Sequence, residues 1–216
     1  MTMQDQAGAG VVPATRAAAM AAGVLATVSM AGVLAGEITQ GTDFMGSAAA
    51  QLLGWAGFAA ACALVVGVAG IGAALAPALS RAMTRVWAVL LLATAATAGA
   101  AATLALVVPA LADRAPEIAN DPPAAVPATF ILSGLVMGVT GIVLGLGIRR
   151  AVPGLPRWVV NLLVVGSVVA IVPLPSRYFL FAFGVAAVLA HVGEAGSSEV
   201  APRAEPELER TSRVRG

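Results

Sequence analysis

Long apolar stretches alternate with short polar segments along the chain, and the apolar stretches number six. They are predicted at about residues 16–36, 48–75, 86–110, 128–148, 157–173 and 177–193. A helix needs roughly 20 mostly apolar residues to cross about 30 Å of hydrocarbon, and each of the first four stretches is long enough. The pattern therefore predicts an all-α fold, a bundle of transmembrane helices.

The last two stretches are shorter, with about 17 residues each, and the tight segment Pro173-Leu174-Pro175-Ser176 joins them. At 1.5 Å per residue each would reach only about 25 Å. Two interpretations are open. The pair either crosses a locally thinned bilayer or forms a re-entrant hairpin buried against the other helices. We favour six full spans.

Arginine is distributed unevenly between the two sides of the predicted bundle. With residues 1–15 in the cytoplasm, ten of the 12 arginines fall on the cytoplasmic side, and only Arg114 and Arg177 fall in external loops. The ten are Arg16, Arg81, Arg85, Arg149, Arg150, Arg157, Arg203, Arg210, Arg213 and Arg215. Because arginine near span ends marks the cytoplasmic side, both termini are predicted to be cytoplasmic. Residues 194–216, polar and rich in charge, are predicted to form a disordered tail.

Composition narrows the class further. Hydrophobic residues make up 59% of the chain and charged residues 11%, whereas a soluble domain is typically about 25% charged. All 12 basic residues are arginine and alanine is abundant, which we interpret as the bias of a GC-rich bacterial genome. The predicted location is therefore the bacterial cytoplasmic membrane, and the lipid bilayer is the first predicted partner.

Small residues recur at helical spacing within the predicted spans. This matters because close packing of backbones, rather than expulsion of water, drives helix association in lipid. The glycines of 128–148 follow one another at spacings of four, three and four residues. The predicted helix-packing positions are Gly32, Gly36, Gly67, Gly134, Gly138, Gly141 and Gly145. A tight bundle is the main interpretation, and a flexing pore or a homodimer seam is the alternative.

Few polar side chains fall inside the predicted spans, and the middle of each span carries no charge. The candidate intramembrane polar positions are Gln51, Thr94, Thr97 and Asn161. Such residues are functional candidates by default, although a threonine hydroxyl can also bond to a carbonyl one turn earlier. Gln51 and Asn161 are each expected to donate an interhelical hydrogen bond. The usual fingerprint of ion-coupled transport is missing.

One pair of segments suggests catalysis. Ser133-Gly134 and Ala190-His191-Val192-Gly193 are similar to fragments of the rhomboid intramembrane proteases, which pair a serine and a histidine from two helices. Both spans run in the same direction, however, so Ser133 and His191 would differ in depth by roughly 15 Å. A hydrogen-bonded dyad needs about 3 Å. No catalytic residue is therefore predicted, and His191 is expected to interact with a helix dipole.

The remaining distinctive side chains suit a membrane better than a ligand. Trp87, Trp158 and Tyr178 lie near predicted span ends, where aromatic residues anchor helices at the interface. The single Cys62 permits no internal disulfide and no thiolate metal cage. No cofactor, metal site or nucleic-acid surface is predicted.

Residues 149–175 contain the pair Arg-Arg, the segment Pro-Gly-Leu-Pro-Arg-Trp and the turn Pro-Leu-Pro. In these the chain resembles uncharacterised small multi-spanning membrane proteins common in GC-rich bacteria. The resemblance implies an architecture and no activity. Our leading hypothesis is a non-enzymatic helical subunit or accessory protein that packs with another membrane protein or with itself. The runner-up is a carrier or channel for a small neutral or lipophilic solute, and a membrane-embedded enzyme is third.

Overall fold

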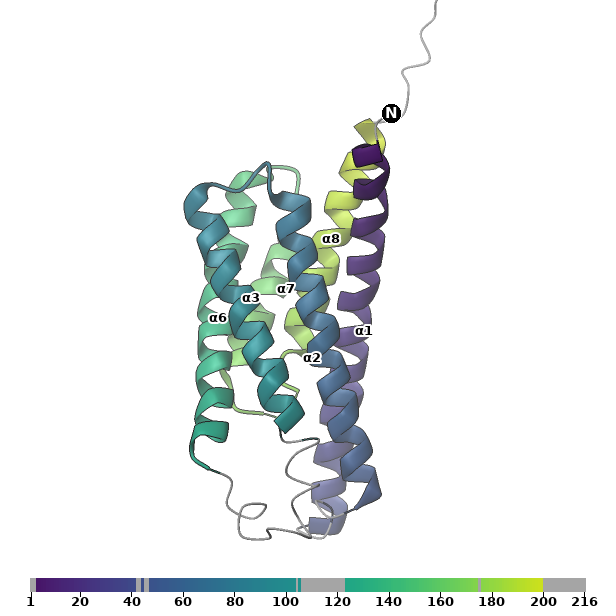
Figure 1. Ribbon diagram of the computed structural model, residues 1–216, viewed down its shortest axis with the longest axis vertical. Helices are drawn as coiled ribbons and strands as arrows, with labels where there is room; N and C mark the ends of the chain where they lie inside the picture. The colour runs from purple at the N-terminus through teal and green to yellow at the C-terminus, as the bar shows by residue number, and fades with distance from the viewer. Residues whose placement is uncertain are drawn as a thin grey trace, which may run out of the picture.

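Six α-helices make up the described part of the computed structural model (Figure 1). The structure describes residues 3–41, 44, 47–103, 105, 123–174 and 176–199, and for residues 3–10 and 194–199 only the backbone. The helices are α1 (Met3–Gln40), α2 (Ala48–Leu75), α3 (Arg81–Ala102), α6 (Ala125–Ala151), α7 (Arg157–Ile171) and α8 (Phe179–Glu199). No strand occurs within these ranges, so the predicted all-α fold is confirmed.

Four helices, α1, α2, α3 and α6, are long and apolar enough to cross a membrane. Their outward side chains suit a lipid environment, since Ile38, Leu52 and Leu92 are between 71% and 84% exposed. Hydrocarbon tails are as apolar as these side chains, so a membrane protein has no need to bury them. The predicted presence of helices able to span a membrane is thus confirmed.

Helix ends differ from the predicted bounds in several places. α1 begins at Met3, so most of the segment 1–15 is helical, and the backbone of α8 continues to Glu199. The first six residues of the predicted tail 194–216 are therefore helical, and the rest lies outside the described residues. The end of the predicted span 86–110 also lies partly outside them.

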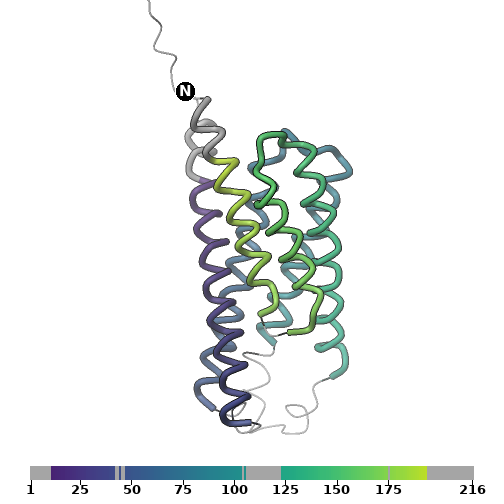
Figure 2. The backbone as a smooth tube through the Cα atoms, turned by 180° about the vertical axis from the view of Figure 1, so that it is seen from behind, coloured from purple at the N-terminus to yellow at the C-terminus, as the bar shows by residue number. Residues whose placement is uncertain are grey.

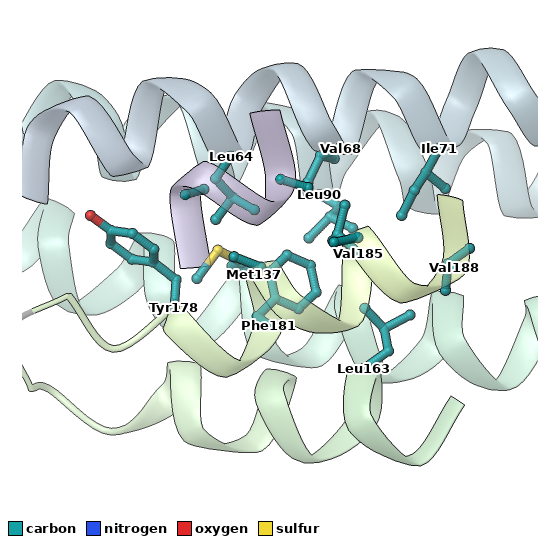
Figure 3. Close-up of a cluster of buried hydrophobic side chains, with 14 of the residues drawn as sticks. Leu64, Val68, Ile71, Leu90, Met137, Leu163, Tyr178, Phe181, Val185 and Val188 are labelled. Atoms are coloured by element: carbon teal, nitrogen blue, oxygen red, sulfur yellow. The ribbon is translucent and has the colours of Figure 1, made fainter. Parts of the chain in front are cut away.

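α8 contacts three other helices, α1, α2 and α7. The pairs α1–α2, α2–α3, α3–α6 and α6–α7 complete the bundle. Figure 2 shows α8 between α1 and α7. The side chains that meet at its inner face come from five helices (Figure 3): Leu64, Val68 and Ile71 of α2, Leu90 of α3, Met137 of α6, Leu163 of α7, and Phe181, Val185 and Val188 of α8. All of them are nearly or fully buried, and they form the hydrophobic core.

The hairpin formed by α7 and α8 turns within the bundle and not at its end (Figure 1). The Tyr178 hydroxyl donates to the carbonyl of Gly57, and Gly57 lies nine residues beyond the start of α2 at Ala48. At 1.5 Å per residue, this contact lies about 13 Å from the N-terminal end of α2. By the same measure, the contact of Arg177 with Phe130 lies about 8 Å from the start of α6 at Ala125.

The α6 glycines lie along the path of this hairpin. A Cβ atom added at Gly134 would meet Arg177, one at Gly138 would meet Ile171 and Ser167, one at Gly141 would meet Ser167 and Phe181, and one at Gly145 would meet Val164 and Leu163. The other three packing positions lie against Leu53 (Gly32), Phe44 (Gly36) and Ala19 (Gly67). The glycine face of α6 therefore receives α7, the turn and α8.

Two glycines that the sequence patterns did not single out lie closest to the backbone of a neighbouring helix. A Cβ at Gly166 of α7 would lie 2.6 Å from Phe181 Cα, and one at Gly184 of α8 would lie 2.6 Å from Leu163 Cα. Both contacts are with backbone atoms, which cannot rotate away. α7 and α8 therefore touch backbone to backbone, and only glycine fits at these two positions without a shift of one helix.

Candidate functional site at the turn between α7 and α8

Three consecutive residues of the turn bind three different helices. Ser176 Oγ donates to Ser29 Oγ of α1 at 2.9 Å. Arg177 Nη2 donates to the carbonyl of Phe130 in α6, and the Tyr178 hydroxyl donates to the carbonyl of Gly57 in α2 at 2.5 Å. Hydrogen bonds to α1, α6 and α2 thus hold the tip of the hairpin within an apolar bundle.

Ser176 adopts a left-handed backbone conformation, with a φ of 48°. A non-glycine residue in this region is uncommon and is maintained only where the surroundings enforce it. Here the enforcing contacts are a relay of hydroxyls, because Ser29 Oγ in turn donates to the carbonyl of Leu53 at 2.9 Å. Gly57 leaves room for that relay, since a Cβ there would lie 3.1 Å from both hydroxyl oxygens.

The structure corrects the expectation for Tyr178. We expected an aromatic anchor at the membrane surface, but the side chain is only 2% exposed and its hydroxyl bonds to α2. A buried phenol needs a hydrogen-bond partner, and the Gly57 carbonyl supplies one. Trp158, in contrast, is 56% exposed.

Arg177 lies in the turn between α7 and α8, between the two apolar stretches as the sequence pattern indicated. Its side chain is not exposed as expected of a loop arginine, however, but 0% exposed. Its guanidinium lies over the ring of Phe130, with Cζ 4.0 Å from the ring centroid. Phe130 therefore binds the cation twice, through its ring and through its carbonyl oxygen.

These contacts satisfy only part of the guanidinium. Nε and Nη1 of Arg177 are buried and have no hydrogen-bond partner among the described residues, and no carboxylate within that part of the chain pairs with the charge. A buried charge costs several kcal/mol unless it is paired and hydrogen-bonded. Ionisable groups at membrane depth typically mark binding sites or solute pathways. Arg177 is accordingly the candidate functional residue of this protein.

Small and hydroxylic side chains of α3 and α6 surround this site. Gly134 leaves the space that the guanidinium occupies. Ser133 Oγ lies 3.1 Å from the Phe130 carbonyl and 3.0 Å from the Thr97 hydroxyl. Of the four polar candidates, Thr97 is thus the one that the fold connects to Arg177, through Ser133 and Phe130.

The other three polar candidates lie elsewhere. The Thr94 hydroxyl bonds to the Leu90 carbonyl one turn earlier at 2.7 Å. Gln51 and Asn161 have exposed side chains, and the interhelical hydrogen bonds expected of them are not among those that the described residues make. Ser133 and His191 do not meet, because His191 Nδ1 contacts the Ala187 carbonyl at 2.9 Å and its ring contacts Trp158.

A feature of the sequence did carry a signal for this site. Arg177 lies between the two shortest apolar stretches, directly after the turn Pro173-Leu174-Pro175-Ser176. A hairpin shorter than the neighbouring helices places the residues of its turn beside the interior of those helices, whatever their charge. Because the turn was interpreted as a surface loop, the burial of Arg177 was not predicted.

The chemistry available at Arg177 is recognition of an anion. A guanidinium is always charged and presents its N–H groups in a planar fork that matches carboxylate or phosphate oxygens. The low dielectric around it strengthens such a pair. No family model matches the chain, and no curated protein or solved structure does either, so the resemblance in residues 149–175 stays a prediction.

Proposed function

We propose that the protein lies in the bacterial cytoplasmic membrane with both termini in the cytoplasm, as four spans and one re-entrant hairpin. Six of the seven described arginines support this orientation, because they gather at the end of the bundle where α1 begins and α8 ends: Arg16, Arg81, Arg85, Arg149, Arg150 and Arg157. α7, with 15 residues, reaches about 22 Å, which supports a hairpin that enters and leaves on the arginine-rich side.

Reporter fusions test the orientation. A fluorescent protein fused after Gly216 is expected to fluoresce in the cytoplasm, and alkaline phosphatase inserted after Arg114 is expected to be active on the outer side. An inactive phosphatase at Arg114 would reverse the proposed orientation. A single cysteine introduced at Leu174, with Cys62 replaced by alanine, is expected to resist membrane-impermeant thiol reagents from both sides. Rapid labelling from outside would show that α7 and α8 cross fully.

Within this architecture, we propose that the protein binds a small anion at Arg177 as a carrier or channel. The observation that supports this proposal is a fully buried guanidinium in which two nitrogens have no hydrogen-bond partner among the described residues. The runner-up hypothesis from the sequence named a neutral or lipophilic solute, and Arg177 favours an anion instead. A small anion suits the site better than a partner's side chain, since the surrounding helices leave the guanidinium no exposed surface.

Anion-dependent stability tests this proposal. Purified protein in a gluconate buffer is melted in the presence of chloride, nitrate, acetate or inorganic phosphate. At 100 times the dissociation constant, a ligand stabilises the folded state by about 2.7 kcal/mol, which for a chain of this size shifts the melting temperature by about 5–10 °C. At least one of the four anions is expected to produce such a shift in the wild type.

The matched variants are Arg177→Gln, which removes the buried charge, and Arg85→Gln, which removes an exposed one. The shift is expected to vanish in the first and to persist in the second. Proteoliposomes then test transport, by swelling in an isosmotic solution of the anion that stabilised the protein. A shift that survives in Arg177→Gln contradicts the site, and binding without flux contradicts the carrier.

The leading hypothesis from the sequence, a non-enzymatic helical subunit, is the second candidate. It is favoured by the packing of the interior, where α7 and α8 touch backbone to backbone and the α6 glycines are covered by neighbouring side chains. Purification from native membranes in a mild detergent, followed by mass spectrometry, discriminates between the two. A stoichiometric protein partner supports the subunit, and a chain that comes alone supports the carrier.

A further inference from the structure

A groove lies on the outside of the bundle, at the arginine-rich end. Its volume is about 590 Å³, within the range of pockets that hold small molecules. α8 forms its floor and α1 and α7 form its walls, in the arrangement that Figure 2 shows. The side chains of the floor are small, because α8 presents Ala186, Ala187 and Ala190 there.

The polar groups of the groove gather at one end. Arg16 of α1 is exposed, and it lines the groove together with Trp158 and His191. The rings of Trp158 and His191 meet edge to face with centroids 5.4 Å apart, and His191 Nδ1 lies 2.9 Å from the Ala187 carbonyl. These two contacts hold the imidazole in the wall of the groove beside the arginine.

The other end of the groove is apolar. Phe183 lies eight residues before His191 on the same helix, which places it about 12 Å further along the bundle. Met20 lies one turn beyond Arg16 on α1. The groove thus has a cation at the arginine-rich end and apolar side chains further along the bundle. In the proposed architecture, the cation lies at the level of the lipid headgroups and the apolar side chains lie toward the middle of the membrane.

We propose that this groove binds one anionic glycerophospholipid, with its phosphate at Arg16 and an acyl chain along the alanine floor. Charge complementarity supports this choice of ligand, because the lining residues that the structure describes include an arginine and no acidic residue. Basic pockets between helices on the cytoplasmic side of membranes bind anionic headgroups. The exposed indole of Trp158 suits the boundary between headgroup and hydrocarbon. The site is independent of Arg177 and of the anion proposed there.

Quenching of Trp158 by brominated lipid tests the site directly. The variant Trp55→Phe/Trp87→Phe leaves Trp158 as the sole tryptophan. It is placed in phosphatidylcholine vesicles that contain a small fraction of either brominated phosphatidylglycerol or brominated phosphatidylcholine. Phosphatidylglycerol is expected to be enriched at Trp158 about five-fold, the factor that corresponds to ~1 kcal/mol from one arginine near the membrane surface. Equal quenching by the two lipids overturns the proposal.

Three further variants separate a built groove from general attraction. Arg16→Gln is expected to abolish the enrichment, and Arg85→Gln, which removes an arginine at the same end outside the groove, is expected to leave it unchanged. Ala190→Leu keeps every charge but fills the floor, and it is expected to lower the enrichment at least two-fold. Equal losses in Arg16→Gln and Arg85→Gln would show non-specific attraction only, and an unaffected Ala190→Leu would exclude the groove.

A second measurement covers the case in which the double tryptophan variant does not fold. The wild type and the same three variants are purified from membranes that contain phosphatidylglycerol, and retained lipid is counted by mass spectrometry. One retained phosphatidylglycerol per wild-type chain, lost in Arg16→Gln and kept in Arg85→Gln, supports the site. No retained anionic lipid on the wild type overturns it.

Discussion

Replacing Gly166 with alanine is expected to lower the free energy of unfolding by about 3 kcal/mol or more. The new Cβ would lie 2.6 Å from both the Leu180 carbonyl carbon and Phe181 Cα. Backbone atoms have no rotamers to escape into, so α7 and α8 must separate and their packed interface must open. For a chain of this size the expected fall in melting temperature is about 6–12 °C. Thermal unfolding in mild detergent, followed by size-exclusion chromatography of the soluble fraction, measures it.

The matched control is Gly99→Ala in α3. A Cβ there would meet no described atom within 4 Å, and alanine favours a helix over glycine by up to about 1 kcal/mol. The same chemical change is therefore expected to be neutral or slightly stabilising at Gly99. A Gly166→Ala variant that melts within 2 °C of the wild type would contradict the backbone contact between α7 and α8.

Replacing Arg177 with methionine is expected to stabilise the protein while it abolishes anion binding. The substitution removes one hydrogen bond to the Phe130 carbonyl and the cation–π contact with its ring, which together contribute about 2–5 kcal/mol. It also removes the desolvation of a fully buried charge whose Nε and Nη1 have no partner in the described part of the chain. Replacing buried ionic groups with apolar ones of similar volume is often neutral or stabilising by about 1–4 kcal/mol. We expect the net change to fall within that range, as a higher melting temperature in anion-free buffer.

The reason for this prediction is that a side chain kept for function often lowers stability. Arg85→Met is the control, because Arg85 is exposed and its replacement is expected to change the melting temperature little. A loss of more than about 3 kcal/mol in Arg177→Met would instead identify Arg177 as a structural ion-pair partner. The variants Asp113→Asn, Glu117→Gln and Asp121→Asn would then reproduce the loss if one of those carboxylates is that partner.

The helices themselves were predictable because the signal for them is local. A span requires only a run of apolar residues, and the predicted range 48–75 coincides with α2 (Ala48–Leu75). The small residues of α6 were equally visible, since spacings of three and four place them on one face of a helix. The starts of α3 at Arg81 and of α6 at Ala125 lie before the apolar runs they serve. Apolarity alone does not locate a helix end, and at α3 the hydroxyl of Ser80 sets it by capping the Met83 N–H.

The candidate site was not predictable in the same way. Nothing near Arg177 in sequence shows that Phe130, 47 residues earlier, supplies a carbonyl and a ring to the guanidinium. Thr97 and Thr94 look alike in sequence, yet only Thr97 meets Ser133 and so adjoins the arginine. Gly166 and Gly184 were not predicted as packing positions because neither belongs to a run of glycines at helical spacing. Their importance depends on the contact between α7 and α8, which the sequence does not show.

The sequence by itself determined that this protein is a set of apolar helices with arginines segregated toward one end, because hydropathy and charge are properties of each segment alone. Only the tertiary structure decided that the α7–α8 turn lies inside the bundle and that Ser176, Arg177 and Tyr178 bind three different helices there. The physical reason is that depth and burial depend on how far a short hairpin reaches beside longer neighbours, and that length relation is set by packing between helices.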